Sequence, residues 1–383
     1  MTKYDVIVVG AGSSGVPIAL SLAQADQKVC VVDKLASPGQ GENKHAIGGI
    51  RATHTTKSKI LTCLKSLEIF SSWEKKYGES IEWIEGGYCF VVYREEHEKM
   101  LKQALPIQKS YGLKIDWIDQ EEIQNHVPGI NPENLRGGTF SPHDGNASPL
   151  VSINAFYREA MNEGAEFNFK ETVTGLETSN GQIKKVKTNK GEYETSWVVN
   201  AAGAGASYIG KMLGLDLPVI PESHEAGVTE PVEHFLEPMI VDLREEPGSK
   251  NYYFYQDKHG SLVFCITPQP PIVGTNIRST SVFLPQIAKR MIGLMPRLKN
   301  LKVRRVWRGL YPMTPDSSPI VGPVKGIKGY INAVGMCGQG FMLGPGLGDL
   351  IARITTEKLT DNDKDVLKEL SLYRDFGIEE KLK

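Results

Sequence analysis

A glycine motif near the N-terminus constrains the fold of this chain more than any other feature. The apolar, β-branched run 4–9 leads directly into GAGSSG at 10–15, which has the G-x-G-x-x-G spacing. Gly10 permits a tight turn off a strand, Gly12 lets the backbone approach a pyrophosphate, and Gly15 lets the next helix pack closely on the sheet. The motif therefore predicts a strand, a phosphate-binding turn and a helix.

The residues after the motif complete a nucleotide-binding unit. Apolar residues recur through 16–23, as expected for a buried helix, and residues 28–32 form a second apolar run that ends at Asp33. The free N–H groups of such a helix point at phosphates. An acidic side chain at Asp33 accepts hydrogen bonds from both ribose hydroxyls, which favours an adenosine without a 2′-phosphate. These residues predict a dinucleotide site and leave open whether the dinucleotide is FAD or NAD.

Length and composition exclude several classes of protein. A chain of 383 residues is long enough for about two domains. Its 44 Lys and Arg against 45 Asp and Glu give no basic excess for binding nucleic acid or an anionic membrane. The five cysteines are scattered without a C-x-x-C pair, and no apolar run approaches the length of a membrane span. Because the N-terminus also lacks the pattern of a signal peptide, we expect a cytoplasmic protein without a metal site.

A long polar loop after Asp33 contains a candidate ligand-binding arginine. The loop covers residues 35–59 and is rich in Gly, Ser, Asn and His. Loops of this length inside a compact chain are usually functional, and this one leaves the ribose end of the nucleotide site. Arg51 follows two glycines and an isoleucine, and a guanidinium beside a cofactor can hold a carboxylate by two parallel hydrogen bonds. We interpret His45 and His54 as solvated residues that are candidates for a base by position only.

Segments of alternating character predict a second sheet. We expect helices at 57–76, 95–111 and 151–163, strands within 81–93, 115–117 and 166–169, hairpin turns at 180–181 and 190–191, and a strand-rich stretch at 218–301. The strand 197–200 ends in the small residues 201–206, which we interpret as part of the same dinucleotide fold, interrupted by inserts. Six glycines between 335 and 348 disfavour regular structure, so we expect a loop that passes flat against a planar ligand, followed by a helix at 349–358.

Four motifs in order resemble one known family. They are GAGSSG at 10–15, VVNAAGAGA at 198–206, GLYPMTPDSSPIVG at 309–322 and GMCGQGFMLGPGLGDLI at 335–351. Together they resemble the FAD-dependent amino acid and amine oxidoreductases of the D-amino acid oxidase superfamily. Within it the chain is most similar to the branch of glycine oxidase, the sarcosine oxidases and dye-linked L-proline dehydrogenase. The resemblance implies an extended FAD and oxidation of a C–N bond by hydride transfer from carbon to flavin N5.

The resemblance also implies the architecture. It is an α/β (α+β) fold in which a Rossmann-like FAD-binding domain carries an inserted antiparallel-sheet substrate domain. We assign residues 1–80, 147–217 and 302–383 to the FAD-binding domain. Residues 81–146 and 218–301 then form the substrate domain, which caps the flavin ring.

Site residues carry over from the family motifs. Arg51 falls where the sarcosine oxidases keep an arginine for the substrate carboxylate, and Tyr253, Tyr311 and Met342 complete the expected catalytic group. The residues expected to bind FAD are Gly10, Gly12, Ser13, Ser14, Gly15, Asp33, Lys34, Lys44, His45, Ala46, Gly49, Val173, Ala201, Ala202, Gly203, Gly309, Gly338, Gln339, Gly340, Phe341, Met342 and Leu343.

Departures from the family pattern refine these expectations. Sarcosine oxidases carry a lysine where Met342 stands, and glycine oxidase has an arginine where Tyr311 stands, so carboxylate binding falls on Arg51. Gly309 replaces the cysteine through which monomeric sarcosine oxidase attaches its flavin, so we expect noncovalent FAD. The segment 262–268 lacks the lysine that promotes reaction with oxygen in some family oxidases. This favours a dehydrogenase with a protein or quinone-like electron acceptor over an oxidase that uses O₂.

The expected partners are a small amino or imino acid, such as sarcosine, glycine or a proline-like acid, an electron acceptor, and other subunits of a heteromeric dehydrogenase. Two alternatives share the same ADP motif. One is an FAD-dependent hydroxylase that uses NAD(P)H, and the other is a non-catalytic flavin subunit that relays electrons in a larger complex.

Overall fold

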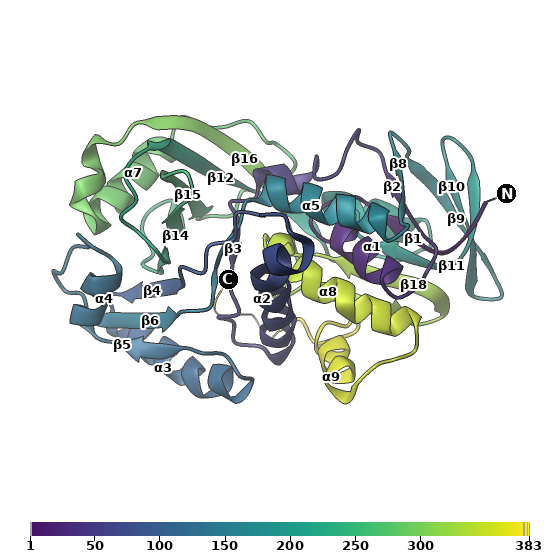
Figure 1. Ribbon diagram of the computed structural model, residues 1–383, viewed down its shortest axis with the longest axis horizontal. Coiled ribbons are helices and arrows are strands. Elements are labelled where there is room, and N and C mark those ends of the chain that lie inside the picture. The colour runs from purple at the N-terminus through teal and green to yellow at the C-terminus, as the bar shows by residue number, and fades with distance from the viewer. Residues whose placement is uncertain (1, 378–379, 381, 383) are drawn as a thin grey trace.

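Two eight-stranded sheets form the framework of the protein, one toward each end of its long axis (Figure 1). The structure is a computed structural model that describes residues 2–377, 380 and 382. The strands of the first sheet are β1 (Thr2–Val9), β2 (Val29–Asp33), β8 (Glu166–Phe169), β9 (Val173–Ser179), β10 (Gln182–Thr188), β11 (Glu192–Asn200), β17 (Ile320–Val324) and β18 (Ile327–Val334). Their order is β17-β18-β10-β11-β1-β2-β8, with β9 paired to β10 and β18 also paired to β11.

Strand β1 lies at the centre of the first sheet because its residues are apolar on both faces. It pairs in parallel with β2 on one side and with β11 on the other. Val6 and Val8 face one hydrophobic cluster and Ile7 faces another, and all three are fully buried. A parallel strand covered on both faces reads as a continuous apolar run, which is what made this strand recognisable in the sequence.

Nine helices cover the sheets in the part of the chain that is described. They are α1 (Gly15–Ala23), α2 (Lys57–Tyr77), α3 (Glu95–Ser110), α4 (Gln120–His126), α5 (Pro149–Asn162), α6 (Ala206–Lys211), α7 (Phe283–Leu294), α8 (Gly340–Thr355) and α9 (Asp361–Glu369). Short 3₁₀ turns stand at Glu42–His45, Gly203–Gly205 and Pro296–Asn300. Helix α1 packs against α5 and α8, and α8 also packs against α2 (Figure 1).

The glycine-rich C-terminal segment is helical, and the expectation of an irregular loop through residue 348 is wrong. Helix α8 already begins at Gly340. A Cβ on Gly344 would overlap the backbone carbonyl of Ser13, and one on Gly346 would overlap that of Thr62. The glycines therefore let α8 approach α1 and α2 at backbone distance, and this packing compensates for the poor helix propensity of glycine.

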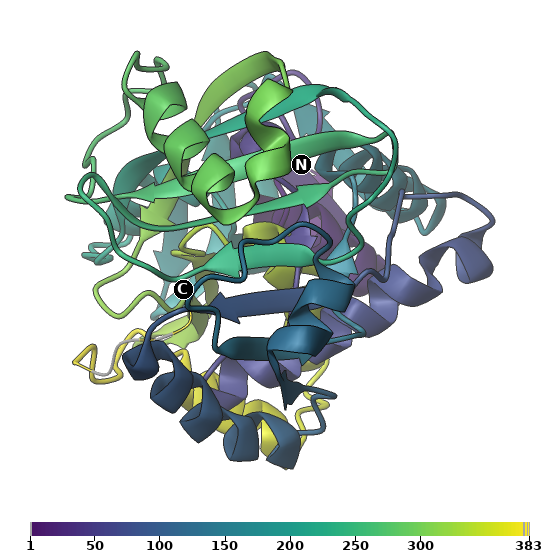
Figure 2. The same cartoon turned by 90° about the vertical axis from the view of Figure 1, so that its left-hand side faces the viewer.

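The second sheet lies toward the other end of the long axis (Figure 1). Its strands are β4 (Tyr88–Val92), β5 (Asp116–Ile118), β6 (Gly137–Ser141), β12 (Ile220–Pro231), β13 (Met239–Asp242), β14 (Ser249–Gln256), β15 (Ser261–Pro268) and β16 (Val303–Met313), in the order β16-β12-β15-β14-β13-β4-β6-β5. All its pairs are antiparallel except the parallel pair β4–β13. Helix α7 covers its outer face (Figure 2). Phe254, Phe264 and Phe283 pack together there.

Strand β16 requires a correction to the predicted domain division. The segment 302–383 was assigned whole to the FAD-binding domain, but β16 pairs with β12 over most of its length and so belongs to the second sheet. The pattern of apolar and polar residues in β16 does not indicate which sheet the strand joins, because that depends on the strand with which it pairs. A small third sheet pairs β3 (Gly49–Ile50) with β7 (Gly145–Asn146). It joins two segments of the chain that each connect the first large sheet to the second.

Candidate active site

A single large cavity connects the glycine motif to the inner face of the second sheet. Its volume is about 1230 Å³, above the range of roughly 300–1000 Å³ that is usual for sites of small ligands. The first sheet and its loops supply one end, including residues 40–49, 171–173 and 201–205. The second sheet supplies the other end, where Tyr88, Phe90, Val241, Lys250, Tyr253 and His224 line the wall.

Most residues expected at FAD line this cavity. Among those expected, only Gly15 and Leu343 do not. A Cβ on Gly15 would overlap the carbonyl of Gly10, so Gly15 serves the packing of α1 on the turn. Leu343 is fully buried in the hydrophobic core between α8 and the first sheet. These two residues therefore support the cavity wall by packing and do not line the cavity.

The nucleotide end fits the ADP part of FAD. Asp33 accepts hydrogen bonds from the backbone N–H of Ala11 and of Leu35, both at 2.7 Å, which fixes its carboxylate at the cavity edge. Helix α1 has no side-chain cap, so its N-terminal N–H groups remain for a phosphate. No atom lies within 4 Å of the place where a Cβ of Gly12 would stand, which leaves open space for the ligand. The cradle of the βαβ unit is thus formed and accessible.

Contacts between the loop, β16 and α8 build a further part of the cavity wall. Trp307 Nε1 donates to the carbonyl of His45 at 2.8 Å, and Glu42 accepts from the N–H of Leu310 at 2.6 Å. A Cβ on Gly338 would overlap the ring of Tyr311, so this ring lies directly on the Gly338 backbone. Helix α8 begins here, also without a side-chain cap. The arrangement brings parts of the predicted segments 43–51 and 338–343 together with Gly309 and Tyr311.

Arg51 is buried where the loop meets the second sheet. Its exposed fraction is 4%, and its guanidinium carbon lies 5.8 Å from the ring centroid of Tyr88 and 5.5 Å from that of Phe90. Nη1 donates to the carbonyl of Thr53, and Nη2 donates to the carbonyl of Leu382 at 2.8 Å. A guanidinium has five N–H donors, so others remain for a ligand. Arg51 lines the cavity.

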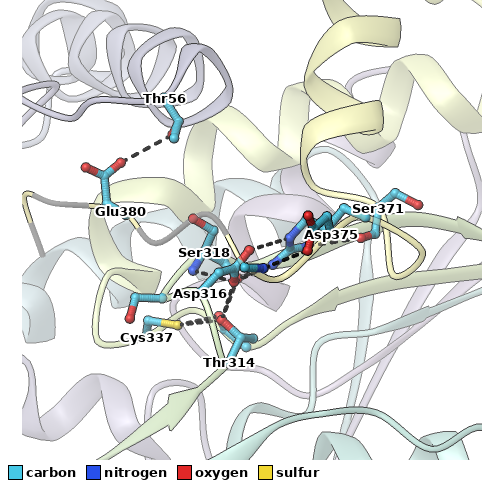
Figure 3. Close-up of polar contacts among 12 residues, drawn as sticks. Thr56, Thr314, Asp316, Ser318, Cys337, Ser371, Asp375 and Glu380 are labelled. Carbon is cyan, nitrogen blue, oxygen red and sulfur yellow. Dashed lines mark hydrogen bonds and ion pairs between the residues drawn. The ribbon is translucent and has the colours of Figure 1, made fainter.

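Glu380 and Leu382 contact this loop, which no sequence pattern indicated. Glu380 accepts hydrogen bonds from the N–H and hydroxyl of Thr55 and from the hydroxyl of Thr56 (Figure 3). Its own N–H donates to the carbonyl of Asp316 at 3.1 Å. Asp316 in turn forms a buried ion pair with Arg374 (2.7 Å). These contacts hold Glu380 between the start of α2 and Asp316.

Two side chains near Arg51 have strongly shifted proton affinities. His54 is fully buried, so its interpretation as a solvated residue is wrong; burial and the charge of Arg51 hold its pKa well below the usual range. Asp144 accepts from the N–H of Ala52 at 3.0 Å, and burial raises its pKa to about 7. His45 is half-buried and lies 3.5 Å from Glu42, at the cavity wall.

The inner face of the second sheet carries a polar cluster. The hydroxyls of Tyr253 and Tyr311 lie 2.8 Å apart, and the ring of His224 stacks on that of Tyr311 with centroids 3.8 Å apart and planes at 13°. Burial raises the pKa of both tyrosines well above their usual range. The two tyrosines were expected from the family motifs, whereas no sequence pattern indicated His224, because its approach to Tyr311 depends on pairing between β12 and β16. Met342 also lines the cavity, from α8.

The residues described contain no group of three or more His, Cys, Asp or Glu side chains placed to hold a metal ion. The five cysteines are free and buried. None of the described helices has the length and apolar composition needed to cross a membrane.

The fold and the site define a class of protein: two large sheets, with a dinucleotide cradle at one end of a cavity and a largely antiparallel sheet over the other end. The family model described as "FAD dependent oxidoreductase" (DAO) matches residues 5–354. The chain therefore belongs to this family, and the predictions of an FAD-dependent oxidoreductase and of its fold are confirmed.

Three similar proteins illustrate the family. The crystal structure of L-proline dehydrogenase from P. horikoshii has 30% sequence identity and a TM-score of 0.90, covering 97% of this chain and 98% of that one. Mitochondrial dimethylglycine dehydrogenase of Homo sapiens is 25% identical over 91% of this chain, which spans only 42% of that protein. Hydrogen cyanide synthase subunit HcnC of Pseudomonas protegens is 23% identical, with 93% of each chain covered.

Proposed function

We propose that this protein oxidises the C–N bond of a small amino or imino acid, with a proline-like or N-methylated acid preferred. The observation that carries the proposal is the position of Arg51, a buried cation that lines the same cavity as the nucleotide cradle and lies against the aromatic wall of the second sheet. The 30% identity to an L-proline dehydrogenase over nearly the whole of both chains supports this substrate class.

The residues of the chain hold the cofactor along the cavity. Asp33 binds the ribose, the N-terminus of α1 with Gly12 binds the pyrophosphate, and residues 43–49, with α8, border the ring. Gly309 carries no nucleophile, and a Cβ there would overlap His45, so the cofactor is held without a covalent bond at this position. When bound, FAD supplies the acceptor for the hydride that leaves the substrate carbon.

Arg51 positions the substrate. Its guanidinium pairs with the carboxylate through the N–H groups not used by Thr53 and Leu382. A fixed carboxylate fixes the direction of the neighbouring C–H bond, which lowers the entropic part of the barrier. The wall formed by Tyr88, Phe90 and Val241 is largely apolar and disfavours an ammonium. The substrate nitrogen is therefore bound neutral, as loss of hydride from the adjacent carbon requires, and the imine formed hydrolyses in water.

We further propose a dehydrogenase that passes electrons to a protein or quinone-like acceptor. The strand β15, which contributes Thr267 and Pro268 to the cavity wall, contains no lysine. Its inward face therefore lacks the cation that would favour reaction with O₂.

The test is anaerobic mixing of the purified holoprotein with proline, sarcosine, glycine, hydroxyproline and D-amino acids, while flavin absorbance is followed. We expect bleaching by proline or sarcosine, and then slower reoxidation by O₂ than by an artificial dye. Rapid bleaching by NADPH alone would instead identify a hydroxylase. No bleaching by any amine would leave the flavin relay subunit as the function.

A further inference from the structure

Asp144 is a fully buried carboxyl group that holds the backbone on the C-terminal side of Arg51. Its Oδ1 atom accepts a hydrogen bond from the N–H of Ala52 at 3.0 Å, and its Oδ2 atom accepts one from the hydroxyl of Thr53 at 3.4 Å. The carbonyl of Thr53 in turn accepts from Nη1 of Arg51. Asp144 does not line the cavity itself, so it reaches the site only through these neighbours of the arginine.

The segment 145–147 holds the backbone on the N-terminal side of Arg51. Strand β7 pairs with β3 there, and the N–H of Ala147 donates to the carbonyl of Gly48 at 3.0 Å. The segment is anchored in its turn by an antiparallel bridge to Ile84. Arg51 therefore lies between two stretches of backbone that are both fixed by Asp144 and the residues directly after it.

The contacts of Asp144 do not depend on its charge. Burial raises the pKa of its carboxyl group to about 7, so both protonation states are populated near neutral pH. Either state has an oxygen that accepts from the N–H of Ala52, and the protonated state can donate to the hydroxyl of Thr53. The contribution of Asp144 to the site is therefore geometric.

We propose that Asp144 is a positioning residue for the substrate carboxylate and that it acts through Arg51. The inference rests on the proposed function, in which the guanidinium of Arg51 pairs with that carboxylate. Two parallel hydrogen bonds require a defined orientation of the guanidinium plane, and an arginine that is free to rotate loses conformational entropy when it binds. Asp144, together with the carbonyl of Leu382, fixes the orientation before the substrate arrives and so reduces this loss.

Binding of pyrrole-2-carboxylate tests the proposal without turnover, because this aromatic acid cannot be oxidised to an imine. Its dissociation constant is measured on the holoprotein from the change in flavin absorbance. We expect Asp144→Ala to weaken binding about five- to tenfold, the loss typical of one hydrogen bond, and to leave FAD affinity unchanged. Asp144→Asn should restore most of the affinity, because the amide keeps an oxygen for Ala52 and a donor for the hydroxyl of Thr53.

A double-mutant cycle with Arg51→Lys separates positioning from a general loss of structure. If Asp144 acts through Arg51, the two substitutions are not additive, and Asp144→Ala should cost less than about twofold in the Arg51→Lys background. Thr53→Val removes one of the two contacts without leaving a large void. It should weaken binding about two- to threefold, again only in the presence of Arg51, and it provides the same test if Asp144→Ala does not fold.

Asp363→Ala is the matched control. Asp363 is also a buried carboxylate, 6% exposed, and accepts from the N–H and the hydroxyl of Thr360, both at 2.8 Å, but it lies in α9 and does not line the cavity. Its substitution should lower stability and leave the binding of pyrrole-2-carboxylate at the wild-type level.

Two outcomes overturn the inference while the amino acid bleaching test still stands. One is an equal loss of affinity for pyrrole-2-carboxylate in the wild-type and Arg51→Lys backgrounds. The other is wild-type affinity in the folded Asp144→Ala variant or, where that variant does not fold, in Thr53→Val. If the wild type does not bind pyrrole-2-carboxylate and no amino acid bleaches its flavin, the proposed function fails, and the inference fails with it.

Discussion

Nη2 of Arg51 donates a hydrogen bond of 2.8 Å to the backbone carbonyl of Leu382, 331 residues further along the chain. Leu382 itself is 1% exposed and packs with Tyr88 and Phe90, the two rings beneath the guanidinium. The side chain proposed to hold the substrate carboxylate is therefore oriented by a segment that is distant in sequence from the rest of the site.

Arg51→Lys should weaken substrate binding more than it affects the cofactor. Lysine keeps the charge but loses the planar fork that pairs with a carboxylate. We expect KM for the amino acid to rise about 10- to 100-fold, the loss of one to two charge-assisted hydrogen bonds. Steady-state kinetics measures this, with FAD content as a check. Arg136→Lys, in an exposed ion pair with Glu98, is the control. Unchanged KM for every amino acid would refute the assignment of Arg51.

Glu380→Ala should destabilise the fold by releasing the C-terminal segment. The carboxylate is 1% exposed and accepts from Thr55 and Thr56, whose donors would be left without partners. We expect a loss of about 1–3 kcal/mol in the free energy of unfolding, together with faster amide exchange at Thr55. Chemical denaturation and hydrogen exchange measure the two effects. Glu194→Ala, at an exposed position on β11, should change neither. Wild-type exchange at Thr55 in Glu380→Ala would show that the segment does not depend on this contact.

Gly344→Ala should damage both packing and cofactor binding. Its Cβ would overlap the carbonyl of Ser13, inside the phosphate-binding turn, so α8 must move away from α1. Overpacking of this kind costs about 1–3 kcal/mol. We expect a lower melting temperature and a weaker FAD affinity. The control is Gly293→Ala in α7, where nothing lies within 4 Å and alanine should stabilise the helix by up to ~1 kcal/mol. Equal melting temperatures of the two variants would contradict this packing argument.

Asp144 should make stability depend on pH. Its pKa is raised from 3.8 to about 7, chiefly by burial. Between these two values the folded state binds more protons than the unfolded state, so the free energy of unfolding falls as pH rises from about 4 to about 7. The integrated effect is at most ~4 kcal/mol. Asp144→Asn removes this part of the slope, whereas Asp216→Asn, at an exposed position, keeps it. Parallel pH profiles of wild type and Asp144→Asn, from urea denaturation, would disprove the shift.

Local sequence was sufficient to predict the nucleotide-binding end of the cavity. The strand, turn and helix of 4–23 are determined by residues next to one another, and Asp33 follows from the length of that unit. The polar loop itself indicated Arg51, and the resemblance to a family supported Arg51 and supplied the tyrosines, which lie on different elements.

Tertiary contacts determined the features that the sequence did not reveal. The helix that starts at Gly340 depends on the backbones of α1 and α2, which make room for it. His54 reads as polar, but Arg51 and Leu382 cover it. His224 and β16 take their positions from pairing between strands whose partner residues are 74 to 93 positions apart. In each case the deciding partner is far away in the chain, where pattern and propensity carry no information.

The order of the first sheet has a consequence for synthesis on the ribosome. Strand β1 is made first, but its neighbour β11 ends at Asn200 and the next strand, β18, ends at Val334. Until these emerge, one edge of β1 has no partner and the phosphate-binding turn has no α8 behind it. Non-local pairing of this kind forms late. The nascent chain is therefore expected to acquire FAD only after translation of its C-terminal third, and its early strands must be protected from misassociation until then.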